Sequence, residues 1–194
     1  MIYKKIMLVL LTCFYCAYFT KQISLKVKGI HANRLAKGSK PKKTCLIELC
    51  LLVITYSIAV TQFLSVILSS DDMESFPEIL SLIGVCLSFI GVVFFVLAIT
   101  TMQSNWRAGI DETQKTNIVS NGIYRVSRNP AFVGFDLLYI GTAIAFPGIA
   151  MISLAIIAAT VLHLQILEEE KYLTREFGDS YAAYKNKTAR YLLF

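Results

Sequence analysis

Five apolar runs constrain the fold of this chain more than any other feature of its sequence. They cover residues 6–19, 45–68, 79–99, 131–146 and 148–167. A helix needs about 20 predominantly apolar residues to cross the hydrocarbon core of a bilayer, and the second, third and fifth runs reach that length. Because lipid cannot satisfy backbone hydrogen bonds, each run is expected to be helical. The sequence therefore predicts an all-α, multi-pass integral membrane protein with about five transmembrane helices, the last two forming a helical hairpin.

Composition and length support this fold class. Hydrophobic residues make up 56% of the 194 residues, against roughly 45–50% in ordinary soluble domains. A chain of this length suits one membrane domain. Within the apolar runs of residues 1–99 the polar interruptions are small or exposed residues, such as Ser57 and Gln62, whereas residues 100–194 carry more unusual polar groups. We therefore expect the first part to act as a scaffold, and the second to concentrate the chemistry in a polar loop, the hairpin and a charged C-terminal tail.

The first apolar run has two interpretations. Lys4 and Lys5 precede it, as in a signal peptide. However, the run ends in bulky aromatic residues such as Tyr18 and Phe19, whereas signal peptidase cleaves after small residues. We therefore expect a retained helix.

The loops differ in charge, and this predicts the topology. The chain has a net charge of +6, and the segment between the first two runs carries only basic charges before Glu48. The next loop is acidic, with Asp71, Asp72, Glu74 and Glu78. By the positive-inside rule the basic loop is cytoplasmic, which puts the loop 100–129 and the tail on the same side. Topology and attraction to membrane lipids explain the basic residues, so no nucleic-acid partner is expected.

A short hairpin is predicted where the Pro147-Gly148 pair joins the last two runs. Its first helix, 131–146, spans about 24 Å at 1.5 Å per residue, less than the roughly 30 Å of hydrocarbon. Small residues of this helix allow a neighbouring helix or a ligand to approach closely, and we expect helix packing. These small residues lie at helical spacing and are Gly134, Gly141 and Ala145.

Three consecutive carboxylates, Glu168, Glu169 and Glu170, follow directly on the last apolar run. Acidic groups at a helix C-terminus are unfavourable to its dipole. Either the helix continues into the tail, or the carboxylates have cationic partners. The tail interleaves aromatic and charged residues at helical period, which is typical of an interfacial helix. The same pattern also suits a segment that folds back over the loop 100–129 and closes a pocket.

Two polar residues, His163 and Gln165, lie inside the last apolar run. Ionisable groups within a membrane segment are costly, so His163 is a candidate functional residue as well as a candidate hydrogen-bonding partner. No zinc-binding spacing accompanies it, and no metal is expected. The sequence also contains no P-loop, no dinucleotide-binding glycine fingerprint and no nucleophile elbow.

Several ordered motifs occur in the second half of the chain. Asn105-Trp106 precede NIVSNGIY at residues 117–124, RNPAFVG follows at 128–134, and EEKYLTREFGDSYAAY occupies 169–184. In this order and spacing they resemble the isoprenylcysteine carboxyl methyltransferase family, whose members are integral membrane enzymes related to phospholipid N-methyltransferases. That family carries Leu-Val-x-x-Gly-x-Tyr, Arg-His-Pro-x-Tyr-x-Gly, and a Glu-Glu pair followed by Phe-Gly-x-x-Tyr-x-x-Tyr.

The resemblance implies a function and a set of site residues. Members of the family use S-adenosylmethionine, which arrives from the cytosol, and a methyl acceptor that is lipidic or prenylated and arrives from the bilayer. We expect Glu170 or His163 to orient the acceptor or take its proton, in an active site that faces the cytoplasm. By matching position, the cofactor-binding residues would be Ile118, Val119, Tyr124, Asn129, Pro130, Ala131, Phe132 and Glu169.

Three positions depart from the family pattern. The histidine before the proline is Asn129 here, and the tyrosine that follows is Phe132. Gln165 occupies the position of an arginine that is linked to the prenylcysteine carboxylate. A neutral amide cannot form a charge-assisted pair with a carboxylate. Gln165 is therefore the expected substrate-binding residue, and it predicts a different methyl acceptor.

Two other functions are compatible with these residues. Sterol reductases carry a similar Arg-His-Pro-x-Tyr stretch and use NADPH, and a non-catalytic membrane scaffold or lipid-binding protein would keep the same fold. The chain has no obvious basic cluster beside the motif of the kind that binds a phosphate. A methyltransferase that acts on a lipidic or membrane-embedded acceptor is therefore the favoured function.

Overall fold

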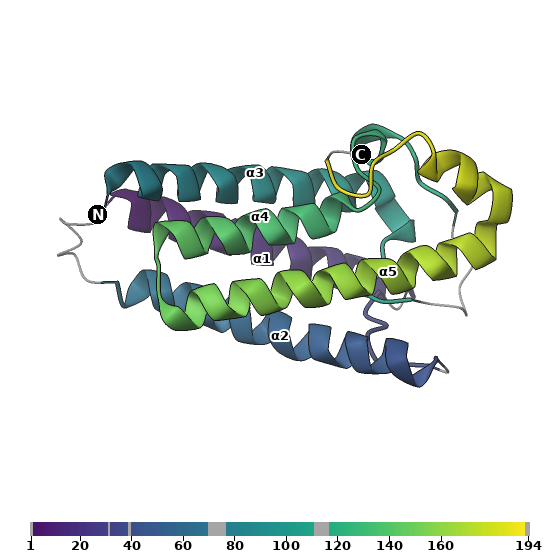
Figure 1. Cartoon of the computed structure of the whole chain (residues 1–194), viewed down its shortest axis with the longest axis horizontal. Coiled ribbons are helices and arrows are strands. Elements are labelled where there is room, and N and C mark those ends of the chain that lie inside the picture. Colours follow the sequence, from purple (N-terminus) through teal and green to yellow (C-terminus); the bar gives the residue numbers. More distant parts are fainter. Residues whose placement is uncertain (1, 31, 39, 70–76, 111–116, 193–194) are drawn as a thin grey trace.

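The computed structural model describes residues 2–30, 32–38, 40–69, 77–110 and 117–192. Asp71, Asp72 and Glu74, which entered the topology prediction, lie outside these residues. Five α-helices run along the long axis of the molecule (Figure 1). The elements are α1 (Ile2–Val27), α2 (Lys42–Ile67), α3 (Glu78–Met102), η2 (Gln103–Asn105), η3 (Gly122–Arg125), α4 (Pro130–Ala145) and α5 (Ile149–Lys185).

The predicted all-α membrane fold is confirmed for the described part of the chain, which contains no strand beyond an isolated bridge between Asn33 and Ala108. Four helices are long and apolar enough to cross a membrane: α1, α2, α3 with η2, and α5. The prediction of about five spans is met in part, because α4 has only 16 residues. Its length is about 24 Å, shorter than the hydrocarbon core.

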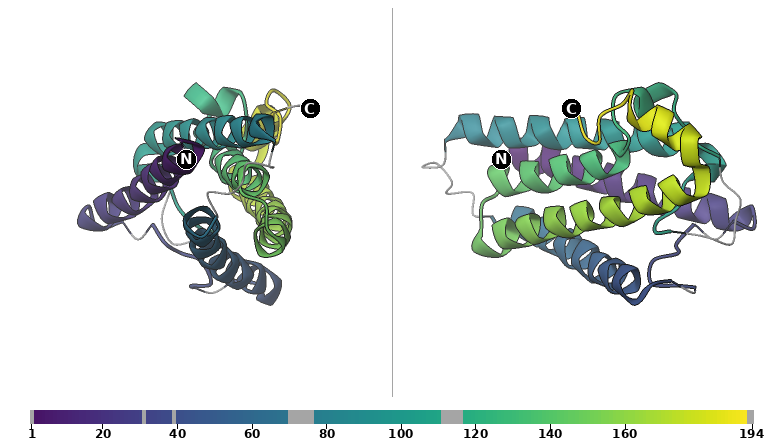
Figure 2. Two further views of the ribbon diagram at one scale, coloured as in Figure 1. Left: turned by 90° about the vertical axis from the view of Figure 1, so that its left-hand side faces the viewer. Right: turned by 45° about the vertical axis from the view of Figure 1, so that its right-hand side comes forward.

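The closest helix contact joins α3 to α4 through glycines. A Cβ atom added at Gly134 would lie 2.8 Å from the carbonyl oxygen of Gly91, and one added at Gly91 would lie 2.7 Å from the carbonyl oxygen of Gly134. Gly84 and Gly141 oppose each other in the same way further along. The two helices lie side by side in both views of Figure 2. The predicted packing role of Gly134 and Gly141 is therefore confirmed.

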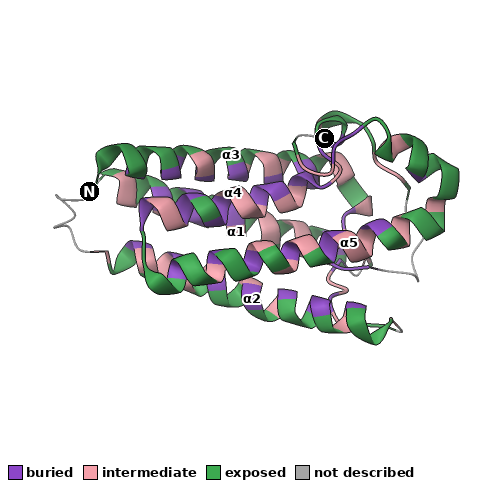
Figure 3. Cartoon of the chain, in the orientation of Figure 1, coloured by how far each residue is buried: buried purple, intermediate pink, exposed green. Residues whose placement is uncertain are grey.

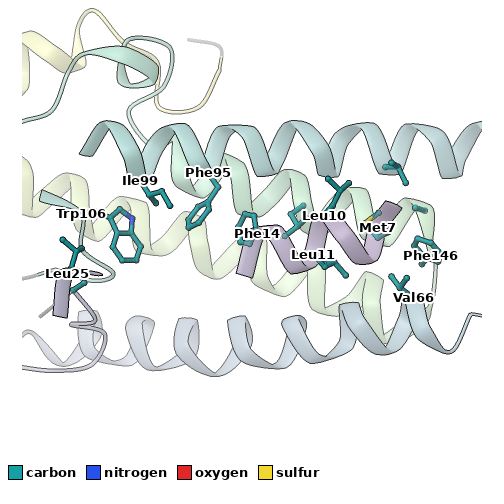
Figure 4. Packing of buried hydrophobic residues seen from close by; sticks show 14 residues of the cluster. Met7, Leu10, Leu11, Phe14, Leu25, Val66, Phe95, Ile99, Trp106 and Phe146 are labelled. Carbon is teal, nitrogen blue, oxygen red and sulfur yellow. The ribbon is translucent and has the colours of Figure 1, made fainter. Parts of the chain in front are cut away.

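The first helix belongs to the core. Phe14 of α1 is fully buried, and its ring centroid lies 4.4 Å from that of Phe95 of α3. Met7 and Leu11 extend the same buried face toward one end of the cluster, and Trp106 closes it at the other (Figure 4). Buried residues line the inward faces of the helices and exposed apolar residues cover their outer faces (Figure 3), as expected of helices whose outer faces contact lipid.

The last helix continues far beyond the bilayer. Its 37 residues correspond to about 55 Å, nearly twice the hydrocarbon thickness. Gly178 interrupts it with a positive φ of 49°, and the chain after α5 returns to the segment before α4, where the backbone N–H of Arg128 donates to the carbonyl oxygen of Ala189 at 2.9 Å (Figure 1). Of the two alternatives for the tail, the structure therefore has the one that folds back.

Replacing Gly134 by Leu is expected to destabilise the protein. The new side chain would collide with the backbone of α3, and overpacking of a core typically costs about 1–3 kcal/mol. The melting temperature of the purified protein in detergent should fall by several degrees. Gly148→Ala is the matched control, because its Cβ would meet nothing within 4 Å and its φ of −166° suits any residue. Equal melting temperatures for the two variants would contradict the glycine-mediated contact.

Candidate functional site

The three consecutive carboxylates of α5 have three different environments, because successive helical residues are rotated by about 100°. Glu168 accepts a hydrogen bond from Thr44 of α2 at 2.8 Å and one from Lys171 at 2.7 Å. Glu169 accepts one from Gln165 at 2.9 Å and faces two cavities. Glu170 forms ion pairs with two arginines, Arg128 and Arg190. Only Glu169 of the three is therefore placed to contact a ligand in either cavity.

The larger cavity is apolar and lies between the membrane helices. Its volume is about 360 Å³. Tyr15 and Tyr18 of α1 and Tyr56, Ala59 and Phe63 of α2 contribute its wall on one side. From α4, Ala131, Phe132 and Phe135 contribute the other. The composition of these walls suits an apolar chain.

The smaller cavity lies beyond the ends of the membrane helices and is rich in aromatic residues. Its volume is about 120 Å³. Ile118 and Val119 line it from the loop before η3. Its other walls come from the extension of α5, with the aromatic residues Tyr172, Phe177, Tyr181 and Tyr184.

The two cavities share a boundary. Seven residues line both: Met102, Arg107, Gly109, Tyr124, Arg128, Glu169 and Leu173. Burial raises the pKa of the Tyr124 phenol well above its usual range, so this residue stays neutral. Of the seven described residues that line both cavities, Glu169 is the one with an acidic side chain. A small polar ligand in one cavity and an apolar chain in the other would therefore meet beside Glu169.

The structure brings most of the predicted cofactor residues to these cavities. Ile118 and Val119 line the smaller one, and Tyr124 and Glu169 line both. The remaining predicted residues come from the Asn129–Phe132 turn: Asn129, Ala131 and Phe132 line the larger cavity, whereas Pro130 is the buried first residue of α4. Proline suits this first helical position because its missing N–H has no helical partner there.

The predicted catalytic and substrate-binding residues lie behind the cavity walls. Among the described residues, His163, Gln165 and Glu170 line neither cavity. Nδ1 of His163 is hydrogen-bonded to the hydroxyl of Tyr191 at 2.6 Å, and the fully buried Gln165 donates to Glu169. Gln165 thus orients the carboxylate that faces the cavities. Direct roles for these three residues in catalysis or acceptor binding stay predictions.

A second buried carboxylate, Glu48 of α2, fastens two loops together. It is fully buried and accepts hydrogen bonds from the backbone N–H groups of Ala36 at 2.8 Å and Ile110 at 2.9 Å. Lys40 donates to it at 2.6 Å, with a side chain that is only 5% exposed. Backbone bonds between residues 32–34 and Ala108 add to this connection. Glu48 therefore fixes the segment that carries Arg107 and Gly109 at the cavity boundary.

Sequence reasoning missed several of these residues. The role of Glu48 had a signal, since it is the single acid that ends a long basic segment. Asp136 of α4 also had one, because it is an acid inside an apolar run; one of its carboxyl oxygens is buried with no hydrogen-bonding partner among the described residues. The tyrosines of α1 and α2 that line the larger cavity had none, because aromatic residues are common in membrane helices.

Comparison with known protein families bears on this geometry. A family model described as phospholipid methyltransferase matches residues 79–180, just over half of the chain. The chain belongs to the phospholipid methyltransferase family. The matched part of this family member includes α3, α4, most of α5 and nearly all of the smaller cavity.

Individual relatives of this family member are 24–32% identical to it over 71–151 residues. Protein-S-isoprenylcysteine O-methyltransferase A of Arabidopsis thaliana is 24% identical over 151 residues, which cover 74% of this chain and 77% of the plant protein. The enzyme of that name from Schizosaccharomyces pombe is 32% identical over 71 residues, 36% of this chain and 30% of the yeast protein. The one from Xenopus laevis is 28% identical over 118 residues, 59% of this chain and 41% of the frog protein. The chain thus spans about three-quarters of the plant relative and less than half of the other two.

These similarities confirm the resemblance to the isoprenylcysteine carboxyl methyltransferases and related phospholipid methyltransferases. This family member is an integral-membrane enzyme of the methyltransferase class. The similarities favour this class over the reductase and scaffold alternatives.

Glu48→Gln is expected to destabilise this enzyme strongly. The change removes the counter-ion of a buried lysine, and breaking a buried ion pair typically costs about 3–5 kcal/mol. The melting temperature should fall by about 10 °C or more. Glu176→Gln, at an exposed position of α5, is the matched control and should melt like the unmodified protein. A Glu48→Gln variant with an unchanged melting temperature would show that the buried pair does not fasten the two loops.

Proposed function

We propose that the chain transfers a methyl group from S-adenosylmethionine to a lipidic or prenylated acceptor. The observation that carries this proposal is the pair of adjoining cavities, one aromatic and beyond the membrane helices, the other apolar and between them. Family membership supports the reaction class. In this proposal the cofactor occupies the smaller cavity and the acceptor occupies the larger one.

The types of residue that line the smaller cavity suit chemical groups of the cofactor. Tyrosine and phenylalanine faces such as those of Tyr172 and Phe177 suit an adenine ring, and aromatic faces also attract a positively charged sulfonium. A carboxylate such as Glu169 accepts hydrogen bonds from ribose hydroxyls or from an amino group. The smaller cavity thus has residues that complement both the charged and the uncharged groups of the cofactor.

In this proposal the protein contributes to the reaction by positioning the two reactants and by excluding water from them. S-adenosylmethionine, when bound, supplies an electrophilic methyl group on sulfur. Alignment of two reactants can supply as much as about 7–11 kcal/mol of a reaction barrier. Glu169, Tyr124 and Arg128 lie at the boundary where that alignment is set. The apolar walls of the larger cavity keep water from the reacting groups.

The acceptor in this proposal is a membrane-associated molecule with an apolar chain. The relatives are named for an S-isoprenylcysteine acceptor, and the larger cavity has apolar walls that suit a prenyl group. Because α1 and α2 supply one of these walls, residues 1–99 contribute to acceptor binding in addition to their scaffold role. Gln165 in place of an arginine supports an acceptor whose reacting end is not a carboxylate.

We propose that the smaller cavity faces the cytoplasm. Arg34 and Lys40 of the basic segment lie beside Glu48, at the same end of the molecule as the Arg107–Ile110 segment. The positive-inside rule assigns this end to the cytoplasmic side. Cytosolic S-adenosylmethionine then reaches its cavity without crossing the bilayer.

Glu169→Gln is expected to weaken binding of S-adenosylhomocysteine, the demethylated product, by about tenfold or more, because a hydrogen bond to a charged group contributes about 1.5–3 kcal/mol. Isothermal titration calorimetry on the purified protein measures this. Glu168→Gln is the matched control, since its carboxylate faces Thr44 and Lys171, and it should bind like the wild type. The proposed function is wrong if the folded wild-type protein binds neither S-adenosylmethionine nor its product.

Ala59→Trp is expected to block the acceptor and spare the cofactor. The indole would fill part of the larger cavity from α2, so methyl transfer to an S-prenylated cysteine or to a membrane lipid extract should fall at least about tenfold. The affinity for S-adenosylhomocysteine should stay unchanged. Leu64→Trp places the same ring on an exposed face of α2 and serves as the control. Unchanged transfer by the Ala59 variant would exclude the larger cavity as the acceptor site.

A further inference from the structure

Glu170 joins three segments that are far apart in the sequence. Its side chain is buried, at 6% exposure, on α5. Nε and Nη2 of Arg128, in the loop before α4, donate to its Oε1 at 3.2 and 2.7 Å. Nε and Nη2 of Arg190, in the C-terminal tail, donate to its Oε2 at 3.2 and 2.8 Å. We refer to Glu170, Arg128 and Arg190 as the arginine–glutamate cluster.

Arg128 is the member of this cluster that reaches the cavities. Arg128 lines both the larger and the smaller cavity. Among the described residues, Glu170 and Arg190 line neither of these two cavities. Nη1 of Arg128 donates to the carbonyl oxygens of Thr188 at 2.6 Å and Lys185 at 3.1 Å. Side-chain bonds to Glu170 and to the tail thus fix the whole guanidinium group.

The tail also holds the residue after Arg128. The carbonyl oxygen of Arg190 accepts hydrogen bonds from Nδ2 of Asn129 at 3.1 Å and from the hydroxyl of Ser127 at 3.2 Å. Tyr191 then anchors the tail to α5 through His163. Asn129 lines the larger cavity, so the tail contacts the cavity wall from behind at two successive residues.

We propose that Arg190 is a positioning residue, which acts through Glu170 and the tail to hold Arg128 and Asn129 at the boundary of the two cavities. Arg190 touches neither cofactor nor acceptor in this arrangement. The carboxylate of Glu170 shares its charge between the two arginines, so the tail and the loop are fastened by one buried group. This inference rests on the proposed function, because the tail is given the task of holding the site in the form that binds the cofactor.

Arg190 is the informative member to change. Its side chain is 33% exposed, so its loss leaves no large cavity. Glu170 would keep Arg128 as its counter-ion, and no buried charge would be left unpaired. The Glu170 carboxylate also raises the pKa of Arg190, which agrees with a firmly held guanidinium. Replacing Glu170 itself would leave the 7% exposed Arg128 without a carboxylate and would report mainly on stability.

The test compares Arg190→Ala, Arg190→Lys and the control Lys187→Ala in the full-length protein, with S-adenosylhomocysteine as the probe in calorimetry. Residues of one ion-pair network are coupled strongly enough for Arg190→Ala to weaken binding about tenfold. Arg190→Lys should recover part of the affinity, because lysine keeps the charge but not the forked geometry. Methylguanidinium added to the buffer should also restore binding to Arg190→Ala. Lys187→Ala removes an exposed tail cation and should bind like the wild type.

Two results would overturn the inference. The first is wild-type affinity in Arg190→Ala. The second is an equal loss in the Ala and Lys variants that follows their melting temperatures and that methylguanidinium does not reverse, which would identify a purely structural residue. Failure of the wild-type protein itself to bind the probe is a different outcome, because it rejects the proposed function.

Discussion

The structure depends on the requirement that a buried carboxylate must have donors around it. Two such carboxylates lie where helices leave the membrane, Glu48 on α2 and Glu170 on α5. An uncompensated buried charge would cost several kcal/mol, so each carboxylate draws in cations and N–H groups from distant segments. Glu48 gathers the loops on one side of the cavities, and Glu170 gathers the pre-α4 loop and the tail on the other. The boundary of the two cavities lies on the segments that these two groups hold.

The three consecutive carboxylates of α5 have complementary roles in this arrangement. Glu168 and Glu170 are engaged with other segments, and Glu169 between them faces the cavities. Its neighbour one turn earlier, Gln165, donates to it. The helix thus supplies, within two turns, two carboxylates bonded to other segments, one carboxylate that faces the cavities, and the amide that orients it. A methyltransferase needs such fixed geometry, since alignment is its main contribution to rate.

Much of the fold could be predicted from local sequence, and much of the site could not. Apolar runs predicted the helices, Pro147-Gly148 predicted the hairpin turn, and Gly134 and Gly141 predicted a close helix contact, because each depends on spacing within one segment. The cluster at Glu170 and the bonds of Glu48 join residues 42 and 62 positions apart. Periodicity carries no information about such pairs. Motif resemblance singled out Tyr124 and Glu169, which both line the two cavities, but it predicted no hydrogen-bonding partner for either residue.

The unbroken path of α5 has a mechanical consequence. The helix runs without interruption from Ile149 in the membrane region past Glu169 to the bend at Gly178. Its hairpin partner α4 is shorter than the hydrocarbon core, and a helix that is too short is accommodated by local thinning of the bilayer. A straight rod pivoting within the bilayer swings most at its far end, where Glu169 and the aromatic wall of the smaller cavity are located. A change in the tilt of α5 would therefore move the wall of the smaller cavity farther than it moves the residues near Ile149.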